Sequence, residues 1–151
     1  MQLPKELLNS LAHAEGFDKE AFKKVHASGE QVTSLRINPS KAISQSPNFP
    51  ISKSNKIPWT DYGFYLNQRP SFTFDPLFHA GCYYVQEASS MFLEQALKQT
   101  VDLSKPLKIL DLAAAPGGKS THIQSLITKD SLLVSNEVIR ARANILRDNI
   151  I

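Results

Sequence analysis

The sequence has 151 residues, of which 42% are hydrophobic and 21% are charged, and this composition excludes a disordered or fibrous chain. The net charge of +3 is mildly basic. No apolar run approaches the roughly 18 residues that span a bilayer, and Glu6 interrupts the first segment, so we expect no secretory signal, no membrane partner and a cytoplasmic protein. The single cysteine, Cys82, excludes an internal disulfide bond. The four histidines lack metal-ligand spacing, so no metal site is expected.

Residues 1–80 predict a small α+β domain. A helix is expected over residues 4–14, and Asp18 is expected to cap a second helix over 19–27 that ends at Gly29. The alternating, β-branched segment 32–38 predicts a strand, and a second strand is expected at 63–66.

A basic segment lies between these two predicted strands. Residues 31–60 contain four cations and no acid, and they are rich in proline and serine. The cations are Arg36, Lys41, Lys53 and Lys56. Such a segment suits a polyanion such as RNA, but it is also typical of a solvated loop, and charge alone leaves both interpretations open.

Residues 81–151 predict the start of a class I (Rossmann-like) α/β domain. Apolar runs that end in an acid alternate with helical patterns, which is typical of a doubly wound parallel sheet. In chain order we expect a helix over 86–100, a strand over 107–112, a helix over 118–128, a strand over 132–137 and a helix over 139–151. Two strands are too few for such a sheet, and the sequence stops inside a helix, so the domain is expected to be truncated.

The segment DLAAAPGGKS, residues 111–120, carries the most chemical information. Its acid follows a buried strand, its alanines let a ligand approach the backbone, and Gly117 and Gly118 permit a tight turn into a helix. The exposed N–H groups at that helix start suit a carboxylate or a phosphate. A second acid, Glu137, follows the next strand 26 residues after Asp111, close to the spacing at which an acid meets a ribose diol.

Several ligands compete for this loop. A phosphate-binding P-loop requires glycine where Ala113 stands, and the Rossmann pattern GxGxxG is absent. A tight turn with no ligand is a further possibility. The diol-binding acid together with the glycine turn favours S-adenosylmethionine, with its amino-acid part beside the turn.

Four segments together resemble one family, the Sun-type RNA (cytosine-5) methyltransferases, especially the bacterial ribosomal RNA members. Besides DLAAAPGGKS they are SLRINP (34–39), FDPLFHAGCYYVQEASSM (74–91) and SNEVIRARANILRDNI (135–150). The resemblance implies an S-adenosylmethionine-dependent methyltransferase domain after an RNA-side N-terminal domain. Its expected partner is RNA, small-subunit ribosomal RNA in particular.

The resemblance also implies a set of cofactor-binding residues. These are Ala114, Ala115, Pro116, Gly117, Gly118, Lys119, Ser120, Glu137 and Arg142. Lys119 would lie near the cofactor's carboxylate and Glu137 would hold its ribose hydroxyls. Arg142 would support the cofactor or the RNA, although an arginine at this place also suits a solvated helix face. A further set, Gln86, Ser89 and Ser90, would line the approach to the loop or pack their own helix.

In this family a cysteine thiolate adds to C6 of cytosine so that C5 can attack the methyl group, and a second cysteine assists release. The Pro-Cys and Thr-Cys blocks that carry these cysteines are absent from residues 1–151, so no catalytic residue is assigned. Cys82 precedes the cofactor motif and matches neither block. We therefore expect these 151 residues to be inactive by themselves.

Two other functions compete with this interpretation. A ribose 2′-O-methyltransferase shares the AAPGG loop, but it carries an aromatic residue at the place of Lys119 and lacks the QEASS block. A non-catalytic RNA-binding or ribosome-assembly protein would explain the missing cysteines. The aromatic residues between 59 and 65, with Arg69, suit either RNA stacking or core packing.

Overall fold

The computed structural model describes residues 3–41 and 55–150 and divides the chain into two compact units, residues 1–32 and 33–151. The domain boundary at residue 80 that we expect from the sequence falls inside the second unit and stays a prediction. Lys53, one of the four cations of the basic segment, lies outside the described residues. Within the two described stretches, no helix has the length and apolar character needed to cross a membrane.

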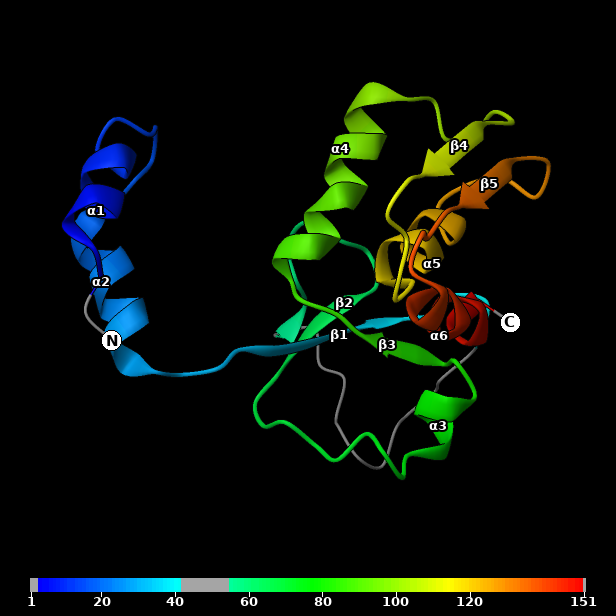
Figure 1. The fold of residues 1–151 in the computed structure, drawn as a ribbon, viewed down its shortest axis with the longest axis horizontal. Helices are drawn as coiled ribbons and strands as arrows, with labels where there is room; N and C mark the ends of the chain where they lie inside the picture. The colour runs from blue at the N-terminus through cyan, green and yellow to red at the C-terminus, as the bar shows by residue number, and fades with distance from the viewer. Residues whose placement is uncertain (1–2, 42–54, 151) are drawn as a thin grey trace. The chain divides into compact units, whose positions relative to one another are not determined.

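The first unit contains two helices, drawn in blue in Figure 1. They are α1 (Lys5–Leu11) and α2 (Lys19–Ser28). The predicted cap of α2 is confirmed, because Oδ1 of Asp18 accepts hydrogen bonds from the N–H groups of Glu20 and Ala21 at 2.9 and 3.0 Å. Gly29 ends this helix with φ of +66°. Helix α1 is shorter than predicted, since Ala14 N–H bonds to Leu11 three residues back and tightens the chain into a turn.

An antiparallel sheet with the strand order β2-β1-β3 begins the second unit. Its strands are β1 (Thr33–Ile37), β2 (Gly63–Leu66) and β3 (Tyr83–Val85). The two strands predicted from the sequence are confirmed, whereas β3 was not predicted. Leu35 and Tyr83 form the buried centre of this sheet, and Phe64 and Phe78 pack against them.

The central strand β1 is buried on both faces, which its alternating pattern did not predict. Besides Leu35, Ser34 and Arg36 are 4% and 3% exposed. The reason is that both faces are covered: Phe72 and Phe78 pack over the face of Leu35, and Arg36 on the other face bonds to Thr121. The polar face of this strand therefore points into the protein.

The helix predicted over 86–100 starts later than expected. Gln86 N–H donates to Ser34 O at 3.2 Å and thereby extends the pairing of β3. A 3-10 helix, η2 (Ser89–Phe92), leads into α4 (Leu93–Thr100), and a short helix α3 (Pro76–His79) precedes β3. The correction concerns the first turn, where sheet pairing replaces helical hydrogen bonds.

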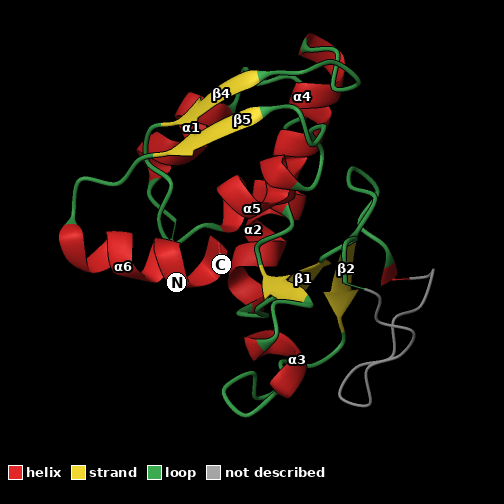
Figure 2. Ribbon diagram, turned by 90° about the vertical axis from the view of Figure 1, so that its right-hand side faces the viewer, coloured by secondary structure: helices red, strands yellow, loops and turns green. Residues whose placement is uncertain are grey.

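The remaining residues form the beginning of a doubly wound α/β fold. Its elements are β4 (Lys108–Asp111), α5 (Gly118–Gln124), β5 (Leu132–Ser135) and α6 (Arg140–Ile150). The two strands are parallel, with Asp111 opposite Ser135, and α5 and α6 lie on one side of them (Figure 2). Helix α5 ends four residues before the predicted end at 128, because Leu126 N–H turns back to Ile123 O.

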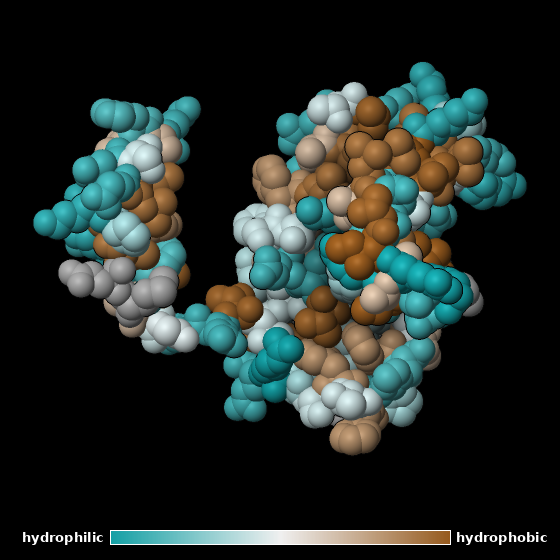
Figure 3. All heavy atoms as spheres, in the orientation of Figure 1, coloured by the Kyte–Doolittle hydropathy of each residue, from teal (hydrophilic) through white to brown (hydrophobic). Residues whose placement is uncertain are grey.

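The other face of this two-stranded sheet is open in the described structure. Leu110, Leu132 and Val134 are 57%, 56% and 48% exposed, and apolar surface gathers over β4 and β5 in Figure 3. Parallel sheets are normally covered on both faces. Helices α5 and α6 cover the opposite face, and both contact the loop that follows β4.

Candidate cofactor-binding site

A loop over residues 112–117 joins the end of β4 to the start of α5. Gly117 has φ of +118°, in the left-handed region that favours glycine. A Cβ at this position would stand 3.3 Å from Cδ1 of Leu146 on α6. The glycine predicted from the motif is thus required by both the backbone and the packing.

Asn136, which follows β5, holds the first half of the loop. Its carbonyl accepts from Ala114 N–H at 2.9 Å, its side-chain amide donates to Leu112 O at 2.9 Å, and its own N–H donates to Asp111 O at 2.8 Å. These bonds tie together the segments that follow β4 and β5. The carboxyl ends of the two parallel strands therefore form one continuous rim, the place at which open α/β sheets bind ligands.

Helix α6 holds the second half of the loop. Nη2 of Arg142 donates to Ala115 O and Nδ2 of Asn149 donates to Pro116 O, each at 2.7 Å. The side chains of Ala114 and Ala115 are buried against Leu146. These contacts fix the second half of the loop against α6.

Glu137 lies just beyond β5, beside the loop. Its side chain is only 4% exposed, and its Oε1 accepts the N–H of Ile139 at 2.9 Å. Its Oε2 lies 3.5 Å from Nη1 of Arg142, so two predicted cofactor residues contact each other. A carboxylate has about four lone-pair directions, so acceptor capacity remains for a diol.

The other predicted residues lie at two different depths. Ser120 is fully buried and donates to Oδ2 of Asp111 at 2.7 Å, so its hydroxyl stabilises the loop. Lys119 is exposed and lines a cavity of about 420 Å³ together with Ser89 and Ser90. Ser89 and Ser90 thus lie beside Lys119 of α5, whereas Gln86 lies elsewhere. That these residues line an approach to the loop stays a prediction.

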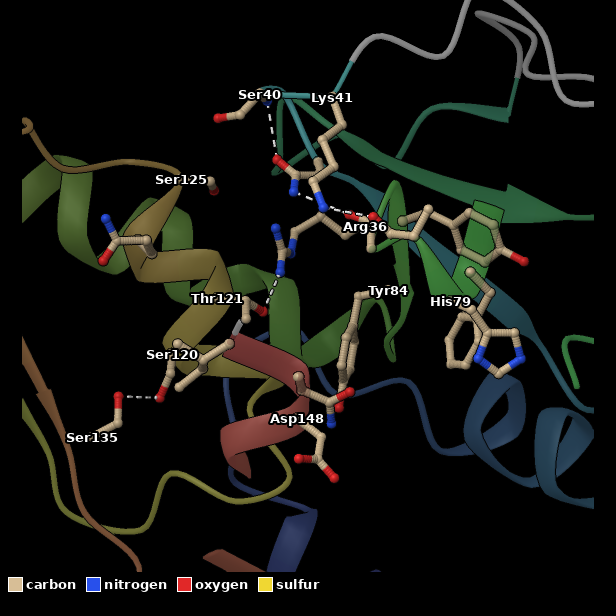
Figure 4. Close-up of a pocket in the computed structure, with 18 of the residues that line it drawn as sticks. Arg36, Ser40, Lys41, His79, Tyr84, Ser120, Thr121, Ser125, Ser135 and Asp148 are labelled. Atoms are coloured by element: carbon tan, nitrogen blue, oxygen red, sulfur yellow. Dashed lines mark hydrogen bonds between the residues drawn. The ribbon is translucent and has the colours of Figure 1, made fainter. Parts of the chain in front are cut away.

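Gln86 belongs to a buried polar cluster behind α5, which the sequence analysis did not detect. Its Oε1 accepts from Nε of Arg36 at 3.0 Å, and Nη2 of Arg36 donates to Oγ1 of Thr121 at 2.7 Å. Burial lowers the pKa of Arg36 to about 10, against the opposing attraction of Glu94, so the guanidinium stays charged at neutral pH. Figure 4 shows Arg36 directed at Thr121.

A second buried cluster is centred on Glu94 of α4, whose side chain is fully buried. It accepts from Thr60 Oγ1 at 2.6 Å, from Lys98 Nζ at 2.7 Å and from His122 Nε2 at 3.0 Å. Burial alone would raise its pKa, but the hydrogen bonds from Lys98, Thr60, His122 and the Asp61 N–H prevail and lower the pKa to about 2. Burial lowers the pKa of His122, which is therefore a neutral donor to the carboxylate.

A larger cavity of about 730 Å³ lies between β1, α5 and the end of α6. Arg36, Lys41, Thr121 and Asp148 are among its lining residues (Figure 4). Of the predicted cofactor residues it includes Ser120, while Glu137 and residues 114–119 lie outside its lining. The candidate site is therefore the rim formed by the loop and Glu137.

The remaining candidates from the sequence lie away from this rim. Trp59 donates to Ala88 O at 2.7 Å, Phe64 joins the core of the antiparallel sheet, and Arg69 stacks on Phe72 at 5.7 Å from the ring centroid. Packing thus accounts for Trp59 and Phe64. Among residues 3–41 and 55–150, no cluster of three or more histidine, cysteine or acidic side chains forms a metal site.

Comparison with known proteins identifies the family. Residues 3–88 match the family described as the N-terminal domain of 16S rRNA methyltransferase RsmF, and residues 98–151 match the family described as 16S rRNA methyltransferase RsmB/F. The fold is thus an N-terminal domain followed by the start of a Rossmann-like methyltransferase domain. The chain belongs to the RsmF family of 16S rRNA methyltransferases.

Individual relatives agree with this assignment. The chain is 33% identical over 126 residues to a ribosomal RNA small subunit methyltransferase F of Aeromonas salmonicida, covering 80% of the chain and 26% of that protein. It is 40% identical over 100 residues to the protein of the same name from Pectobacterium atrosepticum, covering 62% of the chain and 20% of the relative. The chain thus spans about a fifth to a quarter of the length of these relatives.

Solved structures share the fold. A methyltransferase homolog from Pyrococcus horikoshii matches 98% of the chain and 53% of its own length, with a TM-score of 0.65 and 28% identity. The crystal structure of PH0851 matches 97% of the chain and 33% of its own length, with a TM-score of 0.70 and 23% identity. The second likeness concerns the fold alone.

Proposed function

We propose that the chain is the N-terminal part of an S-adenosylmethionine-dependent RNA (cytosine-5) methyltransferase acting on 16S ribosomal RNA. The observation that carries this proposal is the contact between the loop 112–117 and the segment of Asn136 and Glu137, through Ala114 N–H and Asn136 O at 2.9 Å. This contact puts a glycine turn and a buried carboxylate on one rim of a parallel sheet. Family membership supplies the reaction class.

The residues at the rim fit the cofactor by their chemistry. Glu137 offers a carboxylate to the ribose hydroxyls, and Arg142 restrains that carboxylate from the next helix. Lys119, which is exposed at the start of α5, offers an ammonium group to the cofactor's carboxylate. When bound, S-adenosylmethionine supplies an electrophilic methyl group on a sulfonium.

The proposal assigns no nucleophile to residues 1–151. Cys82 lies between α3 and β3, where its backbone N–H donates to Leu77 O at 2.9 Å and its carbonyl accepts from Asn38 at 2.8 Å. It lines neither cavity described above. Its place is therefore that of a residue in a turn, and the cysteine chemistry is assigned to other residues of the complete gene product.

The experiment that tests the proposal is methyl transfer by the complete gene product that contains residues 1–151. Tritium-labelled S-adenosylmethionine is supplied with 16S ribosomal RNA or with transfer RNA, and bisulfite sequencing locates 5-methylcytosine in the product. We expect label in 16S RNA and a new bisulfite-resistant cytosine. Label confined to transfer RNA would overturn the substrate assignment, and label on a ribose oxygen would overturn the cytosine-5 assignment.

A further inference from the structure

We propose that Arg36 is a positioning residue of the cofactor site, which fixes the loop 112–117 from the antiparallel sheet. This inference rests on the proposed function, since it concerns the same loop. Arg36 donates a hydrogen bond to Thr121, which lies 85 positions later in the chain. Arg36 is on the antiparallel sheet, whereas the loop follows β4 of the parallel sheet. None of the cofactor residues expected from the sequence lies on the antiparallel sheet.

A relay of two hydrogen bonds connects Arg36 to the glycine turn. Nη2 of Arg36 donates to Oγ1 of Thr121 at 2.7 Å, and this hydroxyl donates its own hydrogen to Gly117 O at 2.8 Å. The same Nη2 lies 3.5 Å from Gly118 O. Since a hydroxyl can accept one bond while it donates another, both bonds form together. Gly117 is the residue with φ of +118°, so the relay ends at the turn itself.

Because the Arg36 guanidinium is buried, its orientation is fixed and the loss of its hydrogen-bond acceptors costs free energy. Arg36 is 3% exposed, and Gln86 holds its Nε at 3.0 Å, so the guanidinium has a fixed orientation. Loss of either partner would leave a buried charged donor without its acceptor, which costs more than loss of a surface hydrogen bond. The orientation of Arg36 is thus set in the antiparallel sheet and transmitted to the loop.

Tyr84 supports the same positioning from the neighbouring strand. It is the register partner of Arg36 across β1 and β3. A Cβ added at Gly118 would stand 3.0 Å from Cε1 of Tyr84, so the tyrosine ring packs directly on the first residue of α5. Two paired residues of the antiparallel sheet therefore hold the start of α5, one by hydrogen bonding and one by packing.

The test measures S-adenosylmethionine binding to the complete gene product by isothermal titration calorimetry. Arg36→Met removes the donor, and Thr121→Val removes the relay hydroxyl with little change of shape. We expect each variant to weaken binding by about tenfold. Both changes interrupt the same relay, so their effects are not expected to add. The double variant should have about the same affinity as the single variant that binds S-adenosylmethionine less tightly.

Two further variants separate positioning from general stability. Arg36→Lys keeps a cation that reaches one acceptor but not both, so we expect it to recover part of the affinity that Arg36→Met loses. Thr60→Val breaks a buried hydrogen bond of 2.6 Å to Glu94, away from the loop, and is expected to leave the affinity within about twofold.

The outcomes distinguish this inference from the proposed function. If the unmodified protein does not bind S-adenosylmethionine, the proposed function fails. If it binds, and folded Arg36→Met and Thr121→Val proteins bind equally well, the positioning role is wrong while the proposed function stands. Should Arg36→Met fail to fold, Thr121→Val alone decides. Strictly additive losses in the double variant would also contradict the relay.

Discussion

The hydroxyl of Ser120 donates a hydrogen bond of 2.7 Å to Oδ2 of Asp111, and this bond closes the loop between β4 and α5. Ser135 on the neighbouring strand donates in turn to the Ser120 hydroxyl at 3.0 Å. The residues that flank the loop, Asp111 and Ser120, are therefore joined through their side chains, and β5 is part of the same network. This closure fixes the two ends of the loop relative to each other.

Removal of that closure should weaken cofactor binding. We expect Ser120→Ala to lower the affinity for S-adenosylmethionine by about three- to tenfold, because Asp111 loses its donor and the loop loses a restraint. Calorimetric titration measures the change. Ser125→Ala is the matched control. It removes a partly buried hydrogen bond of 2.7 Å from a serine hydroxyl to His122 O, at the other end of α5. Equal affinities for wild type and Ser120→Ala would contradict this role.

Glu137 is expected to contribute through its charge. Glu137→Gln keeps the side-chain shape but loses the carboxylate that faces Arg142 at 3.5 Å and, in our proposal, the ribose hydroxyls. Binding of S-adenosylmethionine should weaken by about tenfold or more. Asp148→Asn, the same chemical change at an exposed position of α6, should have no effect. A similar small loss in both variants would argue against a ligand at Glu137.

Gly117 is expected to tolerate no side chain. Gly117→Ala forces a residue with a Cβ to φ of +118° and puts that atom 3.3 Å from Leu146, so the loop must shift. We expect a loss of stability of about 1–3 kcal/mol together with a loss of cofactor affinity. Gly29→Ala imposes positive φ where nothing lies within 4 Å, and it should lower stability without changing affinity. Retained affinity in Gly117→Ala would refute the assignment of the turn.

The buried Glu94 predicts a specific acid sensitivity. Its pKa is about 2 in the folded protein and 4.5 as the ordinary value, so the unfolded chain takes up this proton first as the pH falls. Its stabilising contribution is complete above pH 4.5 and is lost toward pH 2, by about 3 kcal/mol at roughly 1.4 kcal/mol for each pKa unit. In urea unfolding, the stability difference between wild type and Glu94→Gln should therefore shrink over this range. A difference that is constant with pH would contradict the low pKa.

Cys82 is expected to be dispensable for chemistry. Cys82→Ser changes one atom in a residue whose described contacts are made by its backbone, so methyl transfer by the complete gene product should stay within about twofold of wild type. Radiolabel incorporation measures this, and thermal unfolding shows whether the fold is preserved. Loss of turnover in a stable Cys82→Ser protein would show that the nucleophile has been misassigned.

The sequence predicted the local features of the fold well. The cap at Asp18, both strands of the doubly wound region and the turn at Gly117 depend on residues close together in the chain, and their side chains carry the signal. Strand β3 was missed because three residues are too short for a periodic pattern. The first turn predicted at Gln86 was wrong because pairing with Ser34, 52 positions away, prevailed over helical periodicity.

The candidate site divides in the same way. The loop and Glu137 could be proposed from the sequence, because the loop follows a strand that ends in Asp111 and Glu137 is the acid that follows the next strand. The burial of Arg36 and Glu94 was not predicted, because the residues next to an arginine in a strand or a glutamate on a helix do not show whether its side chain is buried. Their partners, Thr121 and His122, come from distant segments. The local sequence pattern therefore does not predict these buried polar groups.

We propose that S-adenosylmethionine binds at the rim formed by the loop 112–117 and Glu137. Hydrogen–deuterium exchange of the complete gene product, read by mass spectrometry with and without S-adenosylmethionine, tests this placement. We expect slower exchange in peptides that cover residues 111–120 and 135–142, with residues 19–28 unchanged as an internal control. Unchanged exchange at the rim, together with protection elsewhere or nowhere, would contradict it.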